Sequence, residues 1–402
     1  MGYLFRKGGE RNMPSRWAKK INLLSESTTV AVSDRARELQ QSGVKVVNLG
    51  GGDPDFNTPP HIVEAAVNAI NQGFTHYVAS KGIPELRKAI TAKFQRDNNL
   101  VYDPDMEVIV TASGKLALFI ALATIIEPGD EVLYFDPAWV SYEPMIQMLD
   151  GLPIGVHLRP EDNFALDADE LKMRITSRTK AMILNSPNNP TGRVLTQNEL
   201  NIVAKAAVEH GFWVLSDEIY EHIIYDNRQH ISLATLPGMR DLTVTINGMS
   251  KAYAMTGWRL GYLGAPERLC EQILKVQQHV VTCASSFVQT AGVAALQGPQ
   301  SCVDEMTAEY DRRRRFMTEA LNTLPGVKCP LPEGAFYLFP QVNFRDMDSK
   351  ELAKFMIEEA HVAVTPGEAF GKMGKHNIRL TFATSMANLR QAAEQMAVVL
   401  TR

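Results

Sequence analysis

Two cationic side chains lie eight residues apart in one short run of small and apolar residues. Lys251 and Arg259 belong to the sequence Gly-Met-Ser-Lys-Ala-Tyr-Ala-Met-Thr-Gly-Trp-Arg-Leu-Gly, which covers residues 248–261. A lysine amine can form a Schiff base with an aldehyde, and an arginine guanidinium can hold a phosphate group. The run therefore predicts a site for a ligand that carries both an aldehyde and a phosphate. The alternative is a surface lysine and a surface arginine around a turn.

Further polar and aromatic residues follow apolar runs that have the pattern of buried strands. They are Ser113-Gly114-Lys115, Asp136-Pro137-Ala138-Trp139, the run from Asn185 to Gly192, Asp217 with Tyr220, and Lys251 itself. The carboxyl ends of parallel strands meet at one edge of a sheet, and ligands of α/β proteins bind beyond that edge. We therefore expect these residues to form one site, since a sheet with a purely structural role does not require them.

The elements that must position these residues are short apolar runs alternating with helical patterns. The strand-like runs are Glu107–Thr111, Glu131–Phe135, Ala181–Asn185, Phe212–Ser216, Leu242–Ile246 and Leu260–Gly264. Helical patterns such as Lys115–Ile126 and Gln197–His210 lie between them. Apolar strands separated by helices predict an α/β fold with a mostly parallel sheet that is covered on both faces.

The pattern changes after about residue 300. A long charged helical pattern, Ser301–Leu324, precedes three shorter segments and a final helical pattern: Gly334–Pro340, Val362–Pro366, Asn377–Ala383 and Met386–Leu400. This mixture indicates a smaller α+β domain. We expect an N-terminal extension at residues 1–24, a small domain at 25–49 and 300–402, and a large ligand-binding domain at 50–299.

Composition excludes several classes of protein. The chain has 402 residues, which is long enough for two domains. Its net charge of −4 lacks the excess of basic residues that is typical of nucleic-acid-binding proteins. No apolar run reaches the roughly 18 residues of a membrane span, and the basic N-terminus lacks the apolar core of a secretory signal. Neither the four cysteines nor the histidines show metal-ligand spacing. We expect reduced cysteines, a cytoplasmic location and no metal.

The ordered motifs resemble those of class I/II aminotransferases, which are pyridoxal phosphate (PLP) enzymes of fold type I, and bacterial aspartate aminotransferases most closely. The resemblance runs from about Ser25 to the C-terminus, with matches at Gly52, Tyr77, Ser113-Gly114, Trp139, Asn189, Asp217, Tyr220, Lys251, Arg259 and Arg379. It implies a large domain with a mostly parallel seven-stranded sheet flanked by helices, plus a smaller α+β domain. PLP carries both the aldehyde and the phosphate that Lys251 and Arg259 suggest.

The resemblance also assigns the cofactor contacts. Lys251 becomes the catalytic lysine, and Asp217 keeps the ring nitrogen protonated so that the ring can accept electrons. Asn189 and Tyr220 contact the phenolic oxygen, and Trp139 stacks on the ring. The phosphate contacts are Ser113, Gly114, Lys115, Ser250 and Arg259, with Tyr77 of a neighbouring subunit. Some relatives have a serine where this chain has Gly248, so one phosphate contact is expected to be missing or moved.

The same resemblance indicates how the substrate is held. Arg379 matches the arginine that binds the α-carboxylate, assisted by Gly52, Asn189 and Trp139. Lys115 matches a lysine that binds the distal carboxylate in one bacterial subgroup of aspartate aminotransferases. That subgroup also uses an N-terminal segment similar to Ser27-Thr28-Thr29-Val30-Ala31-Val32. Some of these residues could instead have a purely structural role. Ser113 and Asp217 could be helix caps, Trp139 a core residue, Arg379 part of a salt bridge and Tyr77 an exposed loop residue.

We therefore expect transamination between an L-amino acid and a 2-oxo acid, most directly aspartate or glutamate with 2-oxoglutarate or oxaloacetate. We expect a homodimer that shares Tyr77 across its interface. The alternatives are an aminotransferase for aromatic, alanine-like or prephenate-type substrates, or a PLP-dependent lyase of the same fold. A PLP-dependent regulator would carry a DNA-binding domain ahead of the matched region, where only about two dozen residues precede it.

Overall fold

The computed structural model describes residues 17–24 and 28–401, except for the side chain of Thr29. Its largest sheet has the strand order β2-β8-β7-β6-β5-β3-β4. Every neighbouring pair is parallel except the two pairs that β8 makes, which are antiparallel. The bounds are β2 (Val108–Thr111), β3 (Glu131–Asp136), β4 (Leu152–His157), β5 (Thr179–Asn185), β6 (Trp213–Asp217), β7 (Thr243–Gly248) and β8 (Gly261–Gly264). The expected mostly parallel seven-stranded sheet is confirmed.

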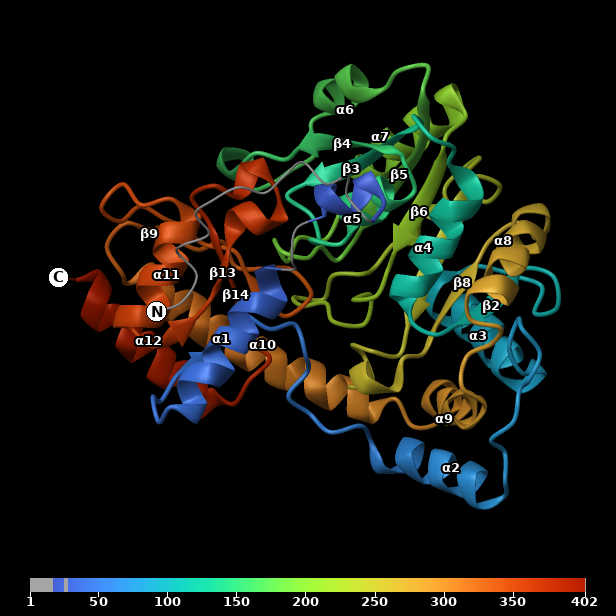
Figure 1. The fold of residues 1–402 in the computed structure, drawn as a ribbon, viewed down its shortest axis with the longest axis horizontal. Coiled ribbons are helices and arrows are strands. Elements are labelled where there is room, and N and C mark those ends of the chain that lie inside the picture. The colour runs from blue at the N-terminus through green and yellow to red at the C-terminus, as the bar shows by residue number, and fades with distance from the viewer. Residues whose placement is uncertain (1–16, 25–27, 402) are drawn as a thin grey trace.

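Alternating residues of the buried strands face two separate hydrophobic cores. In β5, Ala181 and Ile183 contribute to one core, whereas Met182 and Leu184 contribute to the other. Helices therefore cover both faces of the sheet (Figure 1). They are α3 (Pro84–Asn98), α4 (Gly114–Ile125), α5 (Tyr142–Met148), α6 (Ala168–Arg174), α7 (Gln197–His210), α8 (Glu267–Val280) and α9 (Ser286–Gln297), and α2 (Pro60–Asn71) packs on α9.

The predicted strands are confirmed to within a few residues, but sequence reasoning missed β4. This strand pairs only with β3 at the edge of the sheet, and most of its residues are only partly buried. It also contains Pro153 and Gly155, which weaken a strand pattern. An edge strand therefore lacks the continuous apolar run that identified the central strands.

The C-terminal part of the chain packs with α1 and β1 (Figure 1), and it shares a core with β1 and with Tyr220, Ile223 and Tyr225, which follow β6. That core joins Val47 and Leu49 to apolar residues between Met306 and Leu400. Its elements are α1 (Thr28–Gln41), β1 (Val47–Asn48), α10 (Ser301–Asn322), β9 (Val327–Lys328), β10 (Tyr337–Leu338), β11 (Gln341–Val342), α11 (Ser349–Glu359), β12 (Val362–Ala363), β13 (Thr365–Pro366), β14 (Ile378–Thr381) and α12 (Met386–Leu400). The division at residues 25–49 and 300–402 remains our proposal for the small domain.

Short 3-10 helices complete the described elements: η1 (Lys19–Leu23), η2 (Pro160–Asp162), η3 (Leu233–Thr235), η4 (Thr256–Trp258), η5 (Gly367–Phe370) and η6 (Lys372–Gly374). The last two lie against the carboxyl end of β3. Ala138 N–H donates to the Phe370 carbonyl at 2.8 Å, and the Asp136 carboxylate accepts from the Lys372 and Met373 amides. The C-terminal part therefore closes over the sheet edge where the distinctive residues were expected. Within the described residues, no helix has both the length and the apolar character needed to cross a bilayer.

Candidate active site

A cavity of about 430 Å³ lies at the carboxyl ends of the parallel strands. Its walls include most of the residues that the sequence singled out: Gly52, Ser113, Gly114, Lys115, Trp139, Asn189, Asp217, Tyr220, Ser250, Lys251, Arg259 and Arg379. Tyr77 does not line it. That side chain is 86% exposed on the loop between α2 and α3, so a single chain does not bring Tyr77 to its own cavity.

One corner of the cavity is formed by the N-terminus of α4. Ser113 caps this helix, because its Oγ accepts the Leu116 amide at 3.2 Å. A Cβ atom at Gly261 would lie 2.2 Å from the Gly114 nitrogen, so glycine at 261 allows β8 to approach the helix start. Unpaired amides and the helix dipole at such an N-terminus favour an anion.

Arg259 and Ser250 line the cavity together with this helix start. Arg259 has a left-handed backbone (φ 56°), and its side chain donates to the Thr256 carbonyl at 2.8 Å. A Cβ atom at Gly248 would lie only 2.9 Å from the Leu260 carbonyl oxygen. A serine at 248 would therefore require β8 to shift, which gives a steric reason for glycine at this position.

The Lys251 amine lies inside the cavity, where it donates to the Gly52 carbonyl at 2.6 Å. Burial lowers the pKa of Lys251 to about 8, and the positive charges of Arg379 and Arg259 act in the same direction. Asp53 opposes this change. A larger fraction of this amine is therefore neutral near physiological pH than for an exposed lysine, and neutral amines are nucleophiles and bases.

Asp217 ends β6 as a buried carboxylate. Burial raises the pKa of Asp217 to about 6, although a hydrogen bond from Tyr142 opposes this rise. The Tyr142 hydroxyl donates to Asp217 Oδ2 at 2.7 Å. Asn185 positions the neighbouring backbone, since its Nδ2 donates to the Asp217 carbonyl at 2.9 Å. A buried carboxylate of this kind can hold a cationic ring nitrogen.

Arg379 lies on β14, lines the cavity and is 2% exposed. Its guanidinium donates to Asn189 Oδ1 at 3.1 Å and to the Gly50 carbonyl at 2.6 Å. Its Nε is buried without a hydrogen-bond partner among the described residues. The guanidinium also lies over the Tyr337 ring, with its carbon 4.5 Å from the ring centroid. These contacts hold the guanidinium in place at the cavity that Arg379 lines.

Trp139 and Lys115 line the cavity as neighbours. The Lys115 amine lies 4.7 Å from the Trp139 ring centroid, which is within range of a cation–π interaction. Partial burial and the charge of Arg259 lower the pKa of Lys115. Four cationic side chains therefore line the cavity (Lys115, Lys251, Arg259 and Arg379), against the two carboxylates Asp53 and Asp217.

Sequence reasoning missed several residues of the cavity. Tyr142, Tyr337, Asp53 and Ser33 all line it. The signal for Tyr142 was its position three residues after Trp139, and Tyr337 stood in the segment Gly334–Pro340, which we assigned only to the smaller α+β domain. Ser33 comes from α1, the helix that continues the expected N-terminal segment. Of that segment, Ser27 lies outside the described residues.

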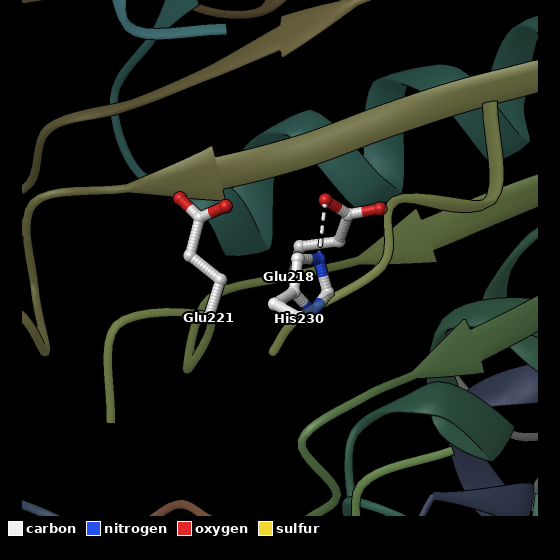
Figure 2. A group of neighbouring side chains, drawn as sticks. All are labelled: Glu218, Glu221 and His230. Atoms are coloured by element: carbon white, nitrogen blue, oxygen red, sulfur yellow. Dashed lines mark hydrogen bonds and ion pairs between the residues drawn. The ribbon is translucent and has the colours of Figure 1, made fainter. Parts of the chain in front are cut away.

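A second polar cluster lies beside the carboxyl ends of β6 and β7, where Asn247 of β7 donates to Glu221. Glu218, Glu221 and His230 approach closely enough to bind a metal ion (Figure 2). The Lys93 amine, however, forms an ion pair with Glu221, and Glu218 accepts from His230 at 2.8 Å. These cations and the surrounding hydroxyl and amide donors already occupy the carboxylate oxygens. The cluster therefore acts as a buried ionic support for the two strand ends.

The donor set of the cavity fits PLP. The helix start at Ser113 and Gly114, with Ser250 and Arg259, provides an anion site at one end. Asp217 provides a carboxylate for the ring nitrogen, and Trp139 provides a flat apolar wall. The Lys251 amine and the guanidinium of Arg379 line the same cavity, so one ligand can contact all of them.

Comparisons with known proteins agree with this geometry. The sequence profile described as aminotransferase class I and II matches residues 44–396. An aspartate aminotransferase of Musicola paradisiaca is 43% identical over 96% of each chain. An aromatic-amino-acid aminotransferase of Thermococcus litoralis is 41% identical over 92% of this chain and 98% of its own. The structure of a Thermus thermophilus aspartate aminotransferase with maleate superimposes with a TM-score of 0.91 and 41% identity, covering 96% of this chain and 99% of that one. The chain therefore belongs to the class I and II aminotransferases and is a transaminase of fold type I.

Proposed function

We propose that the chain binds PLP in this cavity and transfers the amino group of aspartate or glutamate to a 2-oxo acid. The observation that supports this best is that one cavity holds the Lys251 amine, the buried Asp217 carboxylate and the Arg379 guanidinium. When bound, PLP supplies an aldehyde and an electron-accepting ring. The residues of the chain supply binding, orientation and proton transfer.

Lys251 would hold the cofactor and then act as the general base. Its pKa of about 8 suits a base that exchanges protons near neutral pH. Asp217 would keep the ring nitrogen protonated, and Tyr142 would hold the Asp217 carboxylate in place through its hydroxyl. Ser113, Gly114, Ser250 and Arg259 would bind the phosphate, and Trp139 would stack on the ring. Asn189 and Tyr220 would contact the phenolic oxygen.

Arg379 would bind the α-carboxylate of the amino acid. The planar guanidinium can form two parallel hydrogen bonds with a carboxylate, and Arg379 lines the cavity. Gly52 and Asn189 flank the same region. This arrangement would orient every amino-acid substrate in the same way, whatever its side chain.

Lys115 would bind the distal carboxylate of an acidic substrate. The excess of cations in the cavity supports this proposal, as does the similarity to aspartate aminotransferases, one of whose structures contains the dicarboxylate maleate. An aromatic side chain is the second candidate. The ring of Trp139 at the cavity wall and the similarity to an aromatic-amino-acid aminotransferase favour it.

We also propose that the active form is a homodimer in which Tyr77 reaches the phosphate of the neighbouring subunit. The 86% exposure of Tyr77 in one chain is unusual for a tyrosine and supports this role. Val67 and Ile70 of α2, together with Phe74 just after this helix, are exposed nearby and would provide an apolar contact surface. The four free cysteines support a cytoplasmic location.

The test is a panel of ¹⁵N-labelled amino acids with 2-oxoglutarate, analysed by mass spectrometry of the glutamate formed. Labelled aspartate should transfer its nitrogen faster than labelled phenylalanine or alanine. Faster transfer from phenylalanine would support the aromatic candidate instead. Release of labelled ammonia without labelled glutamate would contradict transamination and indicate a lyase.

A further inference from the structure

Two buried tyrosine hydroxyls meet at the wall of the cavity. The hydroxyl oxygens of Tyr220 and Tyr337 lie 2.9 Å apart, and either can be the donor. The two side chains are 4% and 1% exposed. In the part of the chain that the structure describes, each hydroxyl has the other as its one hydrogen-bond partner. The pair therefore shares one hydrogen bond and retains one proton without an acceptor.

The position of the Tyr337 hydroxyl is fixed from several sides. Tyr337 pairs with Thr381 in the antiparallel ladder of β10 and β14, and the Arg379 guanidinium lies over its ring. A Cβ atom at Gly52 would come within 2.6 Å of the Tyr337 oxygen, so glycine at 52 leaves space for the hydroxyl. Tyr337 therefore contacts both the arginine proposed for the substrate and the tyrosine proposed for the cofactor.

The direction of the shared hydrogen bond decides where the remaining proton points. If Tyr337 donates to Tyr220, the Tyr220 proton is free to point into the cavity. A hydroxyl that accepts one hydrogen bond also becomes a better donor in the next, because hydrogen bonds in a chain polarise one another. Burial raises the pKa of both phenols, so both hydroxyls keep their protons near neutral pH.

We propose that Tyr337 is a positioning residue that donates to Tyr220 and thereby directs the Tyr220 proton toward the phenolic oxygen of the cofactor. This inference rests on the proposed function and deepens it. Tyr337 acts through Tyr220 and makes no contact of its own with the reacting atoms. Its hydroxyl stabilises negative charge on the cofactor oxygen only while the Tyr220 hydroxyl is present.

The test is the visible absorbance of the PLP-loaded protein as a function of pH. A weaker donor makes negative charge on the phenolic oxygen less stable, so the protonated chromophore should persist to higher pH. We expect Tyr337→Phe to raise the pH midpoint of the absorbance change by on the order of 0.5 pH unit. The shift cannot exceed the value of the one hydrogen bond between neutral groups that the substitution removes. The dissociation constant for PLP should rise by no more than a few-fold.

A double-mutant cycle separates an effect through Tyr220 from a direct one. In the Tyr220→Phe background, Tyr337→Phe should cause no further shift. An equal shift in both backgrounds would overturn the proposal, because Tyr337 would then act on the chromophore itself. Tyr225→Phe is the matched control: its hydroxyl is also buried but donates to the Ala335 carbonyl at 2.6 Å, so its midpoint should not move.

Two further outcomes separate this inference from the proposed function. If Tyr220→Phe shifts the midpoint and Tyr337→Phe does not, the role of Tyr337 is wrong and the proposed function stands. If the wild-type protein with PLP shows no visible band, both are wrong. Should Tyr337→Phe fail to fold, Gly52→Ala displaces the hydroxyl without removing it. That variant should also raise the midpoint, and the shift should vanish in the Tyr220→Phe background.

Discussion

Replacing Asp217 by asparagine should stabilise the cofactor-free protein at pH 8 while weakening its hold on PLP. Burial raises the pKa of this carboxyl from 3.8 to about 6. Because the pKa of Asp217 is about 2 units higher in the folded protein than in the unfolded chain, its ionisation lowers the free energy of unfolding by ~3 kcal/mol at pH 8. Asparagine removes this charge. It retains an oxygen that can accept from Tyr142, but it loses the acceptor for the Ile219 amide at 3.3 Å.

Loss of the hydrogen bond from the Ile219 amide costs about 1 kcal/mol. The net gain in the free energy of unfolding should therefore be about 1–2 kcal/mol at pH 8. The sign follows from linkage. A raised folded-state pKa destabilises the protein as pH rises from about 4, and the effect is complete above about 6. At pH 5 the ionisation of Asp217 lowers the free energy of unfolding by only about half of the ~3 kcal/mol that it costs at pH 8. The stabilisation should therefore be close to zero at pH 5 and clear at pH 8.

Urea unfolding of the PLP-free protein at both pH values measures this difference. Asp241→Asn, at an exposed carboxylate just before β7, is the matched control and should change stability by less than about 0.5 kcal/mol at either pH. With PLP added, Asp217→Asn should be less stable than wild type, because it loses the partner of the ring nitrogen. Equal destabilisation of the PLP-free variant at pH 5 and pH 8 would refute this account of the buried carboxylate.

Other predictions follow from single contacts. Lys115→Ala should raise the KM for aspartate about 5- to 30-fold, the value of one partly screened charged hydrogen bond, and should leave the KM for leucine nearly unchanged; equal effects would remove the argument for an acidic substrate. Mixing the inactive variants Tyr77→Ala and Lys251→Ala should restore activity, because each mixed dimer holds one intact site; a fully active monomer in sedimentation and kinetic assays would contradict the shared site. Because burial lowers the pKa of Lys251 to about 8, the rate of PLP capture in stopped-flow measurements should rise roughly tenfold from pH 7 to pH 9, and a flat profile would be inconsistent with this amine. Gly261→Ala should weaken PLP binding and lower stability, because the new Cβ would lie 2.2 Å from the Gly114 nitrogen; an unchanged dissociation constant would mean that the phosphate corner tolerates movement.

The sequence predicted the central strands and most of the cavity because both leave local signals. Asp217 and Lys251 each follow a continuous apolar run, and parallel strands bring such ends together. Lys115 and Ser113 mark a helix start directly after a strand. Arg379 stood out as a charged residue within an apolar run, where burial requires a partner. For these residues the position along the chain was enough to predict a common site.

The missed residues act through contacts between distant parts of the chain. The Tyr142 hydroxyl reaches Asp217 across 75 positions, and Tyr337 reaches Tyr220 across 117. Each residue reads from sequence as an aromatic core residue, since nothing local shows where its hydroxyl points. The buried ion pair between Lys93 and Glu221 likewise forms only because α3 packs beside the end of β6. Such pairs become visible only when the packing is known.

The central claim is that Lys251 is the residue that holds the cofactor, and its most direct test is chemical mapping of the PLP-loaded protein. Borohydride reduction followed by peptide mass spectrometry should place a single pyridoxyl group on Lys251. Lys115 is the matched internal control, because its amine lines the same cavity and should remain unmodified. Lys251→Ala should lose both the label and the visible band. A stoichiometric label on Lys115, or on any lysine other than Lys251, would contradict the account.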